Sequence, residues 1–315
     1  MGDWIDQGRG PMVQVLMGVF NGASFLPAQL YSLATQRDAH WRLICADDHS
    51  TDHSAEILRS FARRHPGRVR VHSGPGRGFV ANYLMLLAGL SIDDGHYVAL
   101  ADQDDVWLAG KLSRASRALD RVPPDVPALY TARRWIWTPE KDRTYAEQRR
   151  GIPAFRNALV ENIAPGNTIV LNTAAAVLAR QAAPLAEGVF AHDWWLYQLI
   201  TGAGGRVICD PAYVVLYRQH DRNVIGGRRG AFAMITRKRA VLGGTYQARI
   251  TAQTSGLHRC REFLCPSARA ELDGFLSARD RTAPGRLCAM AALGPYRHNF
   301  WSTVGFWGAI ALGKV

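Results

Sequence analysis

Three of the four residues from 102 to 105 are aspartates, and they directly follow the apolar run HYVALA. Residues two apart in an extended segment share a face, so Asp102 and Asp104 can act on one ligand. Mg²⁺ and Mn²⁺ prefer oxygen ligands of this kind, usually together with substrate phosphates. The spacing alone is a weak signal that also allows solvated acids, and Asp105 could simply cap a helix beginning at VWLAGKL.

The elements that would position these carboxylates alternate along the first third of the chain. Short apolar runs are separated by segments with helical apolar spacing, which predicts βαβ units and a parallel sheet covered on both faces. The four expected strands are MVQVLMGVF (12–20), WRLICA (41–46), VRVHS (69–73) and HYVALA (96–101). Ligands bind beyond the carboxyl ends of such strands. Asn21, Asp47, Asp48 and the three clustered aspartates all lie there, so the sequence predicts the active site at this edge.

Beyond residue 127 the pattern loosens. PALYTARRWIW, TIVLN, RVICD and AYVVLYR are expected strands, whereas TAAAVLARQ and AHDWWLYQLITGAGG are expected helices. Residues after 230 are expected to be helical.

The net charge of +12 is concentrated at the C-terminus: residues 227–315 carry +10 and residues 1–226 carry +2. Such asymmetry indicates a polyanionic partner, either a membrane face, a nucleic acid or an acidic substrate. The terminal stretch FWSTVGFWGAIAL is shorter than the roughly 20 residues needed to span a bilayer. With its aromatic and flanking basic residues it suits an interfacial helix, a helix packed on the domain, or a homo-oligomer contact.

Five scattered cysteines and no signal-peptide pattern at the N-terminus favour a reducing compartment. We therefore expect a cytoplasmic protein, peripheral on the cytoplasmic face of the inner membrane.

The ordered motifs FNG, ADDHSTD, GFVAN, ADQDDVWLAGKL, HDWW and LYRQHDRN resemble glycosyltransferase family 2 over residues 12–226. ADQDDVWLAGKL and LYRQHDRNVIG resemble the bacterial rhamnosyltransferase-like branch. The resemblance implies an α/β GT-A fold, which is a Rossmann-like mixed sheet flanked by helices. It would occupy residues 1–226 and be followed by a basic helical extension over residues 227–315.

The resemblance also implies roles on the donor side. Phe20 and Asn21 would contact the nucleotide base, Asp48 would hydrogen-bond it, and Asp47 would support the loop. Asp102 would reach the ribose.

Further donor-side residues follow from the same motifs. Asp104 would bind the metal, and His220 would add a metal ligand or contact phosphate, although a satisfied loop histidine is equally compatible. Asn82 and Arg77 fall in the stretch near the donor, where Arg77 could instead be a surface residue.

Asp193 matches the family's general base, which takes the proton of the acceptor hydroxyl. His192 stands where the family usually has Glu. The alternative for Asp193 is a helix N-cap. Trp194 and Trp195 could form an apolar platform for the sugar, although a helix at this spacing must bury one side and would place one of them in the core.

Two remaining groups complete the expected site. Arg218, Arg222 and Asn223 could clamp phosphate from one loop, and Asn167 lies where the acceptor-side loop approaches the donor.

These expectations amount to an inverting, metal-dependent transferase with Mg²⁺ or Mn²⁺. It would move a sugar, preferably rhamnose from dTDP-rhamnose, to a surface-glycan or lipid-linked acceptor. A UDP-sugar donor with hexosyl or galactofuranosyl transfer is the alternative. From other classes, the basic tail allows a nucleic-acid-binding protein. FNGAS lacks the three glycines of a dinucleotide-binding turn, which argues against an oxidoreductase. The intact Asp102, Asp104 and Asp193 argue against a catalytically inactive family member.

Overall fold

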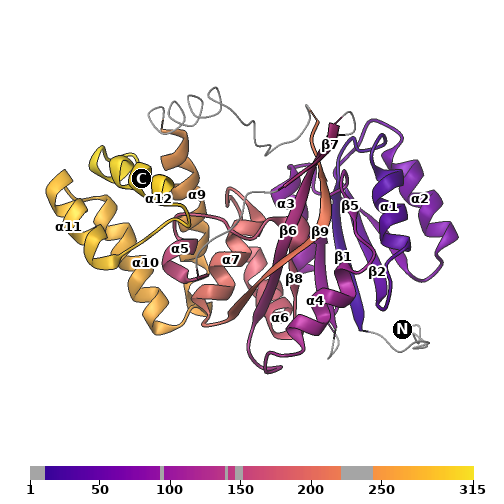
Figure 1. Ribbon diagram of the computed structural model, residues 1–315, viewed down its shortest axis with the longest axis horizontal. Coiled ribbons are helices and arrows are strands. Elements are labelled where there is room, and N and C mark those ends of the chain that lie inside the picture. The colour runs from indigo at the N-terminus through magenta and orange to yellow at the C-terminus, as the bar shows by residue number, and fades with distance from the viewer. Residues whose placement is uncertain (1–10, 93–95, 139–140, 146–151, 221–243) are drawn as a thin grey trace.

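One mixed sheet organises the chain. The computed structural model describes residues 11–92, 96–138, 141–145, 152–220 and 244–315. Within them the strand order is β3-β2-β1-β4-β8-β6-β9-β5, with β7 paired to β6 (Figure 1). The strands are β1 Met12–Val19, β2 His40–Asp47, β3 Val69–Ser73, β4 Tyr97–Ala101, β5 Val106–Trp107, β6 Ala128–Thr138, β7 Lys141–Tyr145, β8 Val170–Leu171 and β9 Arg206–Arg218.

The sheet has a parallel half and a mixed half. β1 pairs in parallel with β2 and β4, and β2 with β3, which confirms the predicted βαβ units. β8 is antiparallel to β4 and β6, and β5 is antiparallel to β9, whereas β6 and β9 are parallel. The sheet is therefore mixed, as the resemblance implies, and not parallel throughout as the alternation by itself suggested.

The two strands expected over RVICD and AYVVLYR are a single strand, β9. Pro211 lies within it and has no N–H to donate to the ladder. The pairing with β6 shifts register between Ala132 and Arg134, so β9 continues past the proline through an irregularity.

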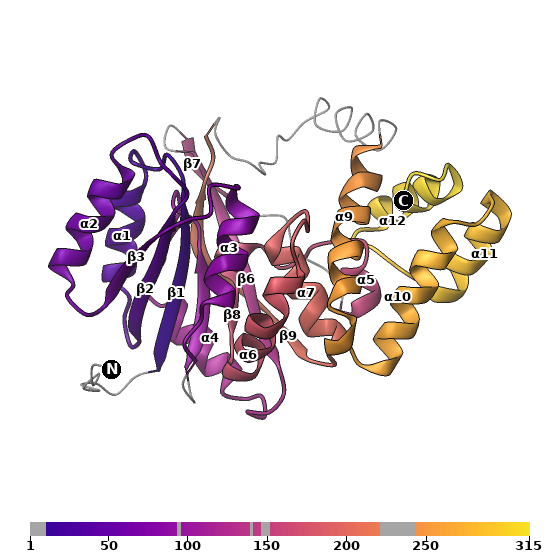
Figure 2. The same ribbon diagram turned by 180° about the vertical axis from the view of Figure 1, so that it is seen from behind.

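Helices cover both faces of the sheet (Figures 1 and 2). The side chains of β1 alternate between two hydrophobic clusters. Val13, Val15 and Met17 pack with the apolar faces of α1, α2 and α4, while Leu16 packs in the cluster of α3, α6 and α7. The helices are α1 Leu26–Ala34, α2 Ser54–Arg64, α3 Phe79–Ala88, α4 Lys111–Leu119, α5 Phe155–Ala158, α6 Thr173–Ala182 and α7 His192–Gly202. Short 3₁₀ turns lie at η1 Gly166–Thr168, η2 Ala183–Leu185 and η3 Arg261–Phe263.

The basic C-terminal region is helical, as predicted, over residues 244–315. It contains α9 Thr245–Arg259, α10 Pro266–Arg279, α11 Ala283–Leu293 and α12 Phe300–Ala311. Ile250, Phe275 and Phe306 from these helices are buried in the same cluster as Trp195 of α7. The expected boundary at residues 226/227 lies outside the described residues, so the division into two domains stays a prediction. In the described part of the chain, no helix is both long and apolar enough to cross a membrane.

Candidate active site

A cavity of about 2050 Å³ opens at the carboxyl ends of β1, β2 and β4 and extends to the C-terminal helices. Most of the predicted site residues line it. Those at the strand ends and on α3 are Phe20, Asn21, Asp48, Asn82, Asp102 and Asp104, and those facing them are Asp193, Trp194 and His220. The structure therefore brings together motifs that are up to 200 residues apart in the sequence.

The loop after β1 is tied to the loop after β2. Asn21 has a left-handed backbone with φ of 48°. Its N–H donates to Ser50 Oγ at 2.9 Å, and its Oδ1 accepts from the N–H of Thr51 at 2.8 Å. Ser50 Oγ in turn donates to Asp47 Oδ1 at 2.5 Å. Asp47 thus contacts the loop and does not line the cavity.

Asp48 fixes the Gly-rich loop that leads into α3. Its two carboxylate oxygens accept from the N–H groups of Gly76 at 2.6 Å and Gly78 at 2.8 Å. Both glycines have positive φ, 68° and 87°, a conformation that other residues rarely adopt. The carboxylate of Asp48 is consequently buried and holds one wall of the cavity in place.

Two further residues of this stretch have different surroundings. The amide of Asn82 donates to Ala46 O at 2.9 Å, and its buried Oδ1 has no partner among the described residues. Asn82 itself lines the cavity. Arg77 does not line the cavity: it pairs with Glu187 at 2.7 Å and is 64% exposed. The structure thus favours the surface alternative for Arg77 over a phosphate contact.

The three clustered aspartates place their carboxylate oxygens within 4.8 Å of one another. The Tyr83 hydroxyl lies 2.5 Å from Ala101 O and 3.3 Å from Asp102 Oδ1. Burial, together with the charges of Asp104 and Asp193, raises the pKa of Asp102 to about 7. Negative charge is therefore concentrated without full compensation here. Carboxylate oxygens of this kind fit Mg²⁺ or Mn²⁺.

Asp105 has a structural environment distinct from its two neighbours. It is fully buried, and its carboxylate accepts from Asn167 Nδ2 at 2.5 Å and from the N–H of Arg218 at 3.3 Å. Lys111 is buried nearby, with Nζ 3.1 Å from the Trp107 ring centroid. Burial raises the pKa of Asp105 and lowers that of Lys111.

This arrangement corrects two expectations. Asp105 does not cap α4, because Val106–Trp107 form β5 and the helix begins at Lys111 with Gly110 as its N-cap. Asn167 does not reach the cavity, because its side chain is fully buried against Asp105.

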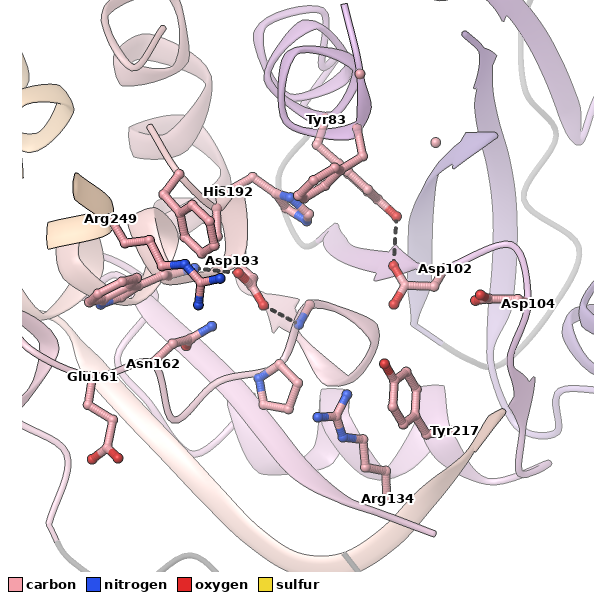
Figure 3. Close-up of a pocket in the computed structure, with 18 of the residues that line it drawn as sticks. Tyr83, Asp102, Asp104, Arg134, Glu161, Asn162, His192, Asp193, Tyr217 and Arg249 are labelled. Atoms are coloured by element: carbon pink, nitrogen blue, oxygen red, sulfur yellow. Dashed lines mark hydrogen bonds between the residues drawn. The ribbon is translucent and has the colours of Figure 1, made fainter. Parts of the chain in front are cut away.

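Asp193 lies in the first turn of α7, where Ala191 is the N-cap. Its Oδ1 accepts from the N–H of Trp194 at 2.7 Å and its Oδ2 from the N–H of Gly166 at 3.0 Å. These two amides hold the carboxylate toward the cavity, across from Asp102 (Figure 3). Asp193 combines a local contact at the helix N-terminus with a place in the cavity wall.

The two tryptophans of HDWW have different positions. Trp194 lines the cavity and donates its indole N–H to Ala158 O at 2.7 Å. Trp195 is fully buried in the core and does not line the cavity. The structure thus follows the alternative in which one of the two tryptophans lies in the core, because opposite sides of α7 face the cavity and the core.

His192 is a buried histidine in the cavity wall. Its ring stacks on Tyr83, with centroids 3.9 Å apart, and meets the edge of Phe79. Both ring nitrogens are buried and have no hydrogen-bond partner among the described residues. Burial lowers the pKa of His192 to about 4, against the opposing effect of the Asp193 charge. The imidazole is therefore neutral at pH 7.

The end of β9 contacts the acidic cluster. His220 Nε2 lies 2.8 Å from Asp104 Oδ2, and the imidazole stacks on Phe25 at 4.3 Å. Arg218 does not line the cavity: it donates through Nε to Asp104 O at 3.0 Å and lies over Trp137. Its contacts support the aspartate loop and do not place it as a phosphate clamp. Arg222 and Asn223 lie outside the described residues.

Several cavity residues were not predicted from the sequence. Arg134 of β6 lies over the Tyr217 ring at 4.2 Å, and its charge opposes the rise in the pKa of Asp102 (Figure 3). The doubled arginine within the apolar run ALYTARRWIW was a usable signal. The C-terminal region adds Arg249 of α9, Arg297 of the loop before α12 and Trp301 of α12, for which no motif gave a signal.

Comparisons with known proteins agree with this architecture. The family model described as glycosyl transferase family 2 matches residues 14–174, just over half of the chain. The dTDP-rhamnosyl transferase RfbG of Shigella flexneri is 23% identical over 247 residues, which cover 76% of this chain and 84% of that protein.

Two solved structures share the fold at low sequence identity. The mannosyltransferase PcManGT from Pyrobaculum calidifontis, in complex with GDP-Man and Mn²⁺, has a TM-score of 0.51 at 16% identity, covering 97% of this chain and 87% of that one. Residues 1–349 of S. aureus TarS, in complex with UDP, have a TM-score of 0.51 at 11% identity, covering 96% and 88%. With its GT-A fold and the matching family model, the chain belongs to glycosyltransferase family 2.

Proposed function

We propose that the protein is an inverting, metal-dependent glycosyltransferase that moves a sugar from a nucleoside diphosphate to an acceptor hydroxyl. One observation carries the proposal: Asp193 faces Asp102 and Asp104 across a single cavity (Figure 3). A transferase needs these two functions on opposite sides of the reacting carbon, a base for the acceptor and a site for the departing diphosphate.

The donor nucleotide would lie along the strand ends. Phe20, Asn21, Asp48 and Asn82 line the cavity there. The preferred donor is dTDP-rhamnose, supported by the relative RfbG and by the branch resemblance of the motifs. A UDP-sugar is the alternative donor.

Asp104 and His220 would hold the Mg²⁺ or Mn²⁺ ion, with Asp102 beside them. When bound, the cation offsets negative charge on the departing diphosphate. Arg134 faces the same region from β6 and adds a fixed positive charge.

Asp193 would act as the general base. Its carboxylate is oriented by the N–H groups of Trp194 and Gly166, so its position needs no rearrangement before it accepts the acceptor's proton. General-base catalysis of this kind contributes about 10²- to 10⁴-fold. A single displacement with one base and no covalent sugar intermediate inverts the anomeric centre, whereas retention by a covalent route needs a nucleophilic carboxylate.

The acceptor would be a surface-glycan or lipid-linked hydroxyl, reached at the cytoplasmic face of the inner membrane through the basic C-terminal region. Residues 227–315 carry +10, which suits an anionic surface. The same charge would also suit DNA or RNA, but the carboxylates that line the cavity would repel a polyanion.

A thermal-shift panel tests the proposal, with dTDP, UDP, GDP, NAD and a short DNA duplex, each with and without Mg²⁺ or Mn²⁺. A ligand at 100 times its dissociation constant stabilises the fold by about 2.7 kcal/mol. We expect a metal-dependent shift with dTDP. A shift with UDP instead would change the donor, and a shift only with DNA, or with NAD without metal, would overturn the proposal.

A further inference from the structure

The cavity is larger than a nucleotide sugar requires. Its volume of about 2050 Å³ exceeds the roughly 300–1,000 Å³ usual for small-molecule sites. The additional space is walled by the C-terminal region, through Tyr246 and Arg249 of α9, residues 297–299 and one side of α12. This second part of the cavity is continuous with the part that contains Asp193.

One side of α12 forms an apolar trough in this wall. Trp301, Gly305, Gly308 and Leu312 all line the cavity, and their spacing of four, three and four residues places them on one helical face. A Cβ atom added at Gly305 or Gly308 would meet no atom of the described residues within 4 Å, so none of these residues fills the space above the two glycines. Trp301 and Leu312 are 76% and 63% exposed and stand at the two ends of the trough.

The face of α12 that carries the trough is exposed although the opposite face of the helix is packed firmly against the domain. Phe306 and Ile310 of α12 are buried in the core. Arg286 of α11 donates through Nε to Ile310 O at 2.6 Å, which holds the carboxyl end of α12. Four of the eight exposed large apolar side chains in the described residues belong to this one helix and its end: Trp301 and Leu312 in the trough, and Phe300 and Val304 outside the cavity wall. An apolar patch concentrated in this way indicates a binding surface.

Cationic groups line the cavity together with the trough. Arg297 and His298 are paired with Glu161, at 3.3 Å and 2.8 Å. Arg249 stacks on Phe190 at 4.6 Å and has no carboxylate partner within the part of the chain that the structure describes. Figure 3 shows its guanidinium on the same side of the cavity as Asp193. Arg249 therefore offers an uncompensated charge for an anionic group close to the reaction centre.

We propose that the α12 trough binds the hydrocarbon chain of a phospholipid-type acceptor whose phosphate contacts Arg249 and whose sugar hydroxyl reaches Asp193. The inference rests on the proposed transferase function and specifies its acceptor. A carboxylate base, a free cation and an apolar trough line one cavity, which matches a molecule with a sugar, a phosphate and a hydrocarbon chain. The trough is part of the cavity wall, so its occupant is a substrate and not a bilayer surface.

Two neighbouring residues of α12 provide the test. Trp301 and Phe300 are almost equally exposed, at 76% and 72%, but only Trp301 lines the cavity. Binding of farnesyl phosphate would be measured by calorimetry for the wild type and for Trp301→Ala, Phe300→Ala, Gly308→Leu and Arg249→Ala. We expect at least a tenfold loss of affinity for Trp301→Ala and Gly308→Leu, and none for Phe300→Ala. Arg249→Ala should weaken farnesyl phosphate and leave farnesol binding unchanged.

Parallel measurements distinguish this acceptor site from membrane docking and from simple anion binding. Equal losses for Phe300→Ala and Trp301→Ala, with matching losses on phosphatidylglycerol vesicles, would indicate membrane docking and overturn the acceptor site. Inorganic phosphate binding as tightly as farnesyl phosphate would overturn the role of the trough. Nucleoside diphosphate binding is measured on every variant: if it is intact while farnesyl phosphate does not bind, the acceptor inference fails and the proposed function stands. Gly305→Leu repeats the trough test if Gly308→Leu unfolds.

Discussion

His192 lies face to face with Tyr83, with ring centroids 3.9 Å apart and ring planes 14° apart. The Tyr83 hydroxyl reaches Asp102, and His192 immediately precedes Asp193. The stacked pair of Tyr83 and His192 thus connects Asp102 with Asp193, the two carboxylates that face each other across the cavity. Because the imidazole is buried against an aromatic ring, its charged form is disfavoured at this position.

Replacing His192 with Phe should make the protein more resistant to acid. The pKa of His192 is about 4 in the folded protein and about 6.5 when unfolded, so the unfolded state binds more protons between these values. The contribution of the neutral His192 side chain to the free energy of unfolding is complete above pH 6.5 and is lost as the pH falls toward 4. At 1.36 kcal/mol per pH unit, the loss amounts to about 3 kcal/mol.

Urea denaturation of wild type and His192→Phe at pH 4.5 and pH 7.5 measures this difference. Phe keeps the stacking on Tyr83 but has no group that titrates. The free energy of unfolding of the variant, relative to that of the wild type, should therefore be higher at pH 4.5 than at pH 7.5. The same difference at both pH values would show that His192 titrates normally in the folded protein.

Replacing Asp104 with Ala should weaken metal-dependent binding of the nucleoside diphosphate by at least about tenfold. The carboxylate lies within the acidic cluster and contacts His220, so its loss removes a ligand oxygen from the expected metal site. Calorimetric titration of the nucleotide with and without Mn²⁺ measures the effect. Asp125→Ala is the matched control, since Asp125 is exposed in the turn before β6 at the opposite edge of the sheet. Equal metal dependence in both variants would exclude Asp104 as a ligand.

Replacing Asp193 with Asn should abolish transfer and spare donor binding. The amide can still accept the N–H of Gly166 or Trp194, so the loop geometry is largely retained, but it cannot accept the acceptor's proton. We expect kcat to fall about 10²- to 10⁴-fold with an unchanged dissociation constant for the nucleoside diphosphate. Normal transfer by this variant would show that another group is the base.

Replacing Glu161 with Gln should destabilise the protein at neutral pH. Glu161 is buried and binds Arg297 and His298, and these partners lower its pKa from 4.5 to about 2. Its stabilising effect is complete above about pH 5 and is lost as the pH falls through about 2. We expect a loss of about 3 kcal/mol at pH 7, and a smaller one at pH 3, in the free energy of unfolding measured by urea denaturation. A loss that does not shrink at the lower pH would contradict a stabilising role for the ion pairs.

Local pattern in the sequence predicted the strand ends and much of what lies there. Apolar periodicity located β1 to β4, and polar residues that follow a buried strand must emerge at its end, so Asn21, Asp48, Asp102 and Asp104 could be assigned to one edge. The resemblance added Asp193, which no periodicity would have connected with them. The positions of the strand-end residues could be predicted because each depends on a few consecutive residues.

Tertiary packing decided which polar and aromatic residues reach the cavity. Asp105 and Asn167 satisfy each other in the interior, and Trp195 faces the core, although each stands beside a residue that lines the cavity. The periodicity of a strand or helix predicts which of its sides is apolar, but not which other element packs against that side. In the same way, Arg249 and Trp301 enter the cavity wall only because α9 and α12 fold back toward α7. The sequence alone thus determined the family and the edge of the sheet at which the polar residues gather. The distant half of the cavity depended on contacts between segments more than fifty residues apart, which leave no local pattern in the chain.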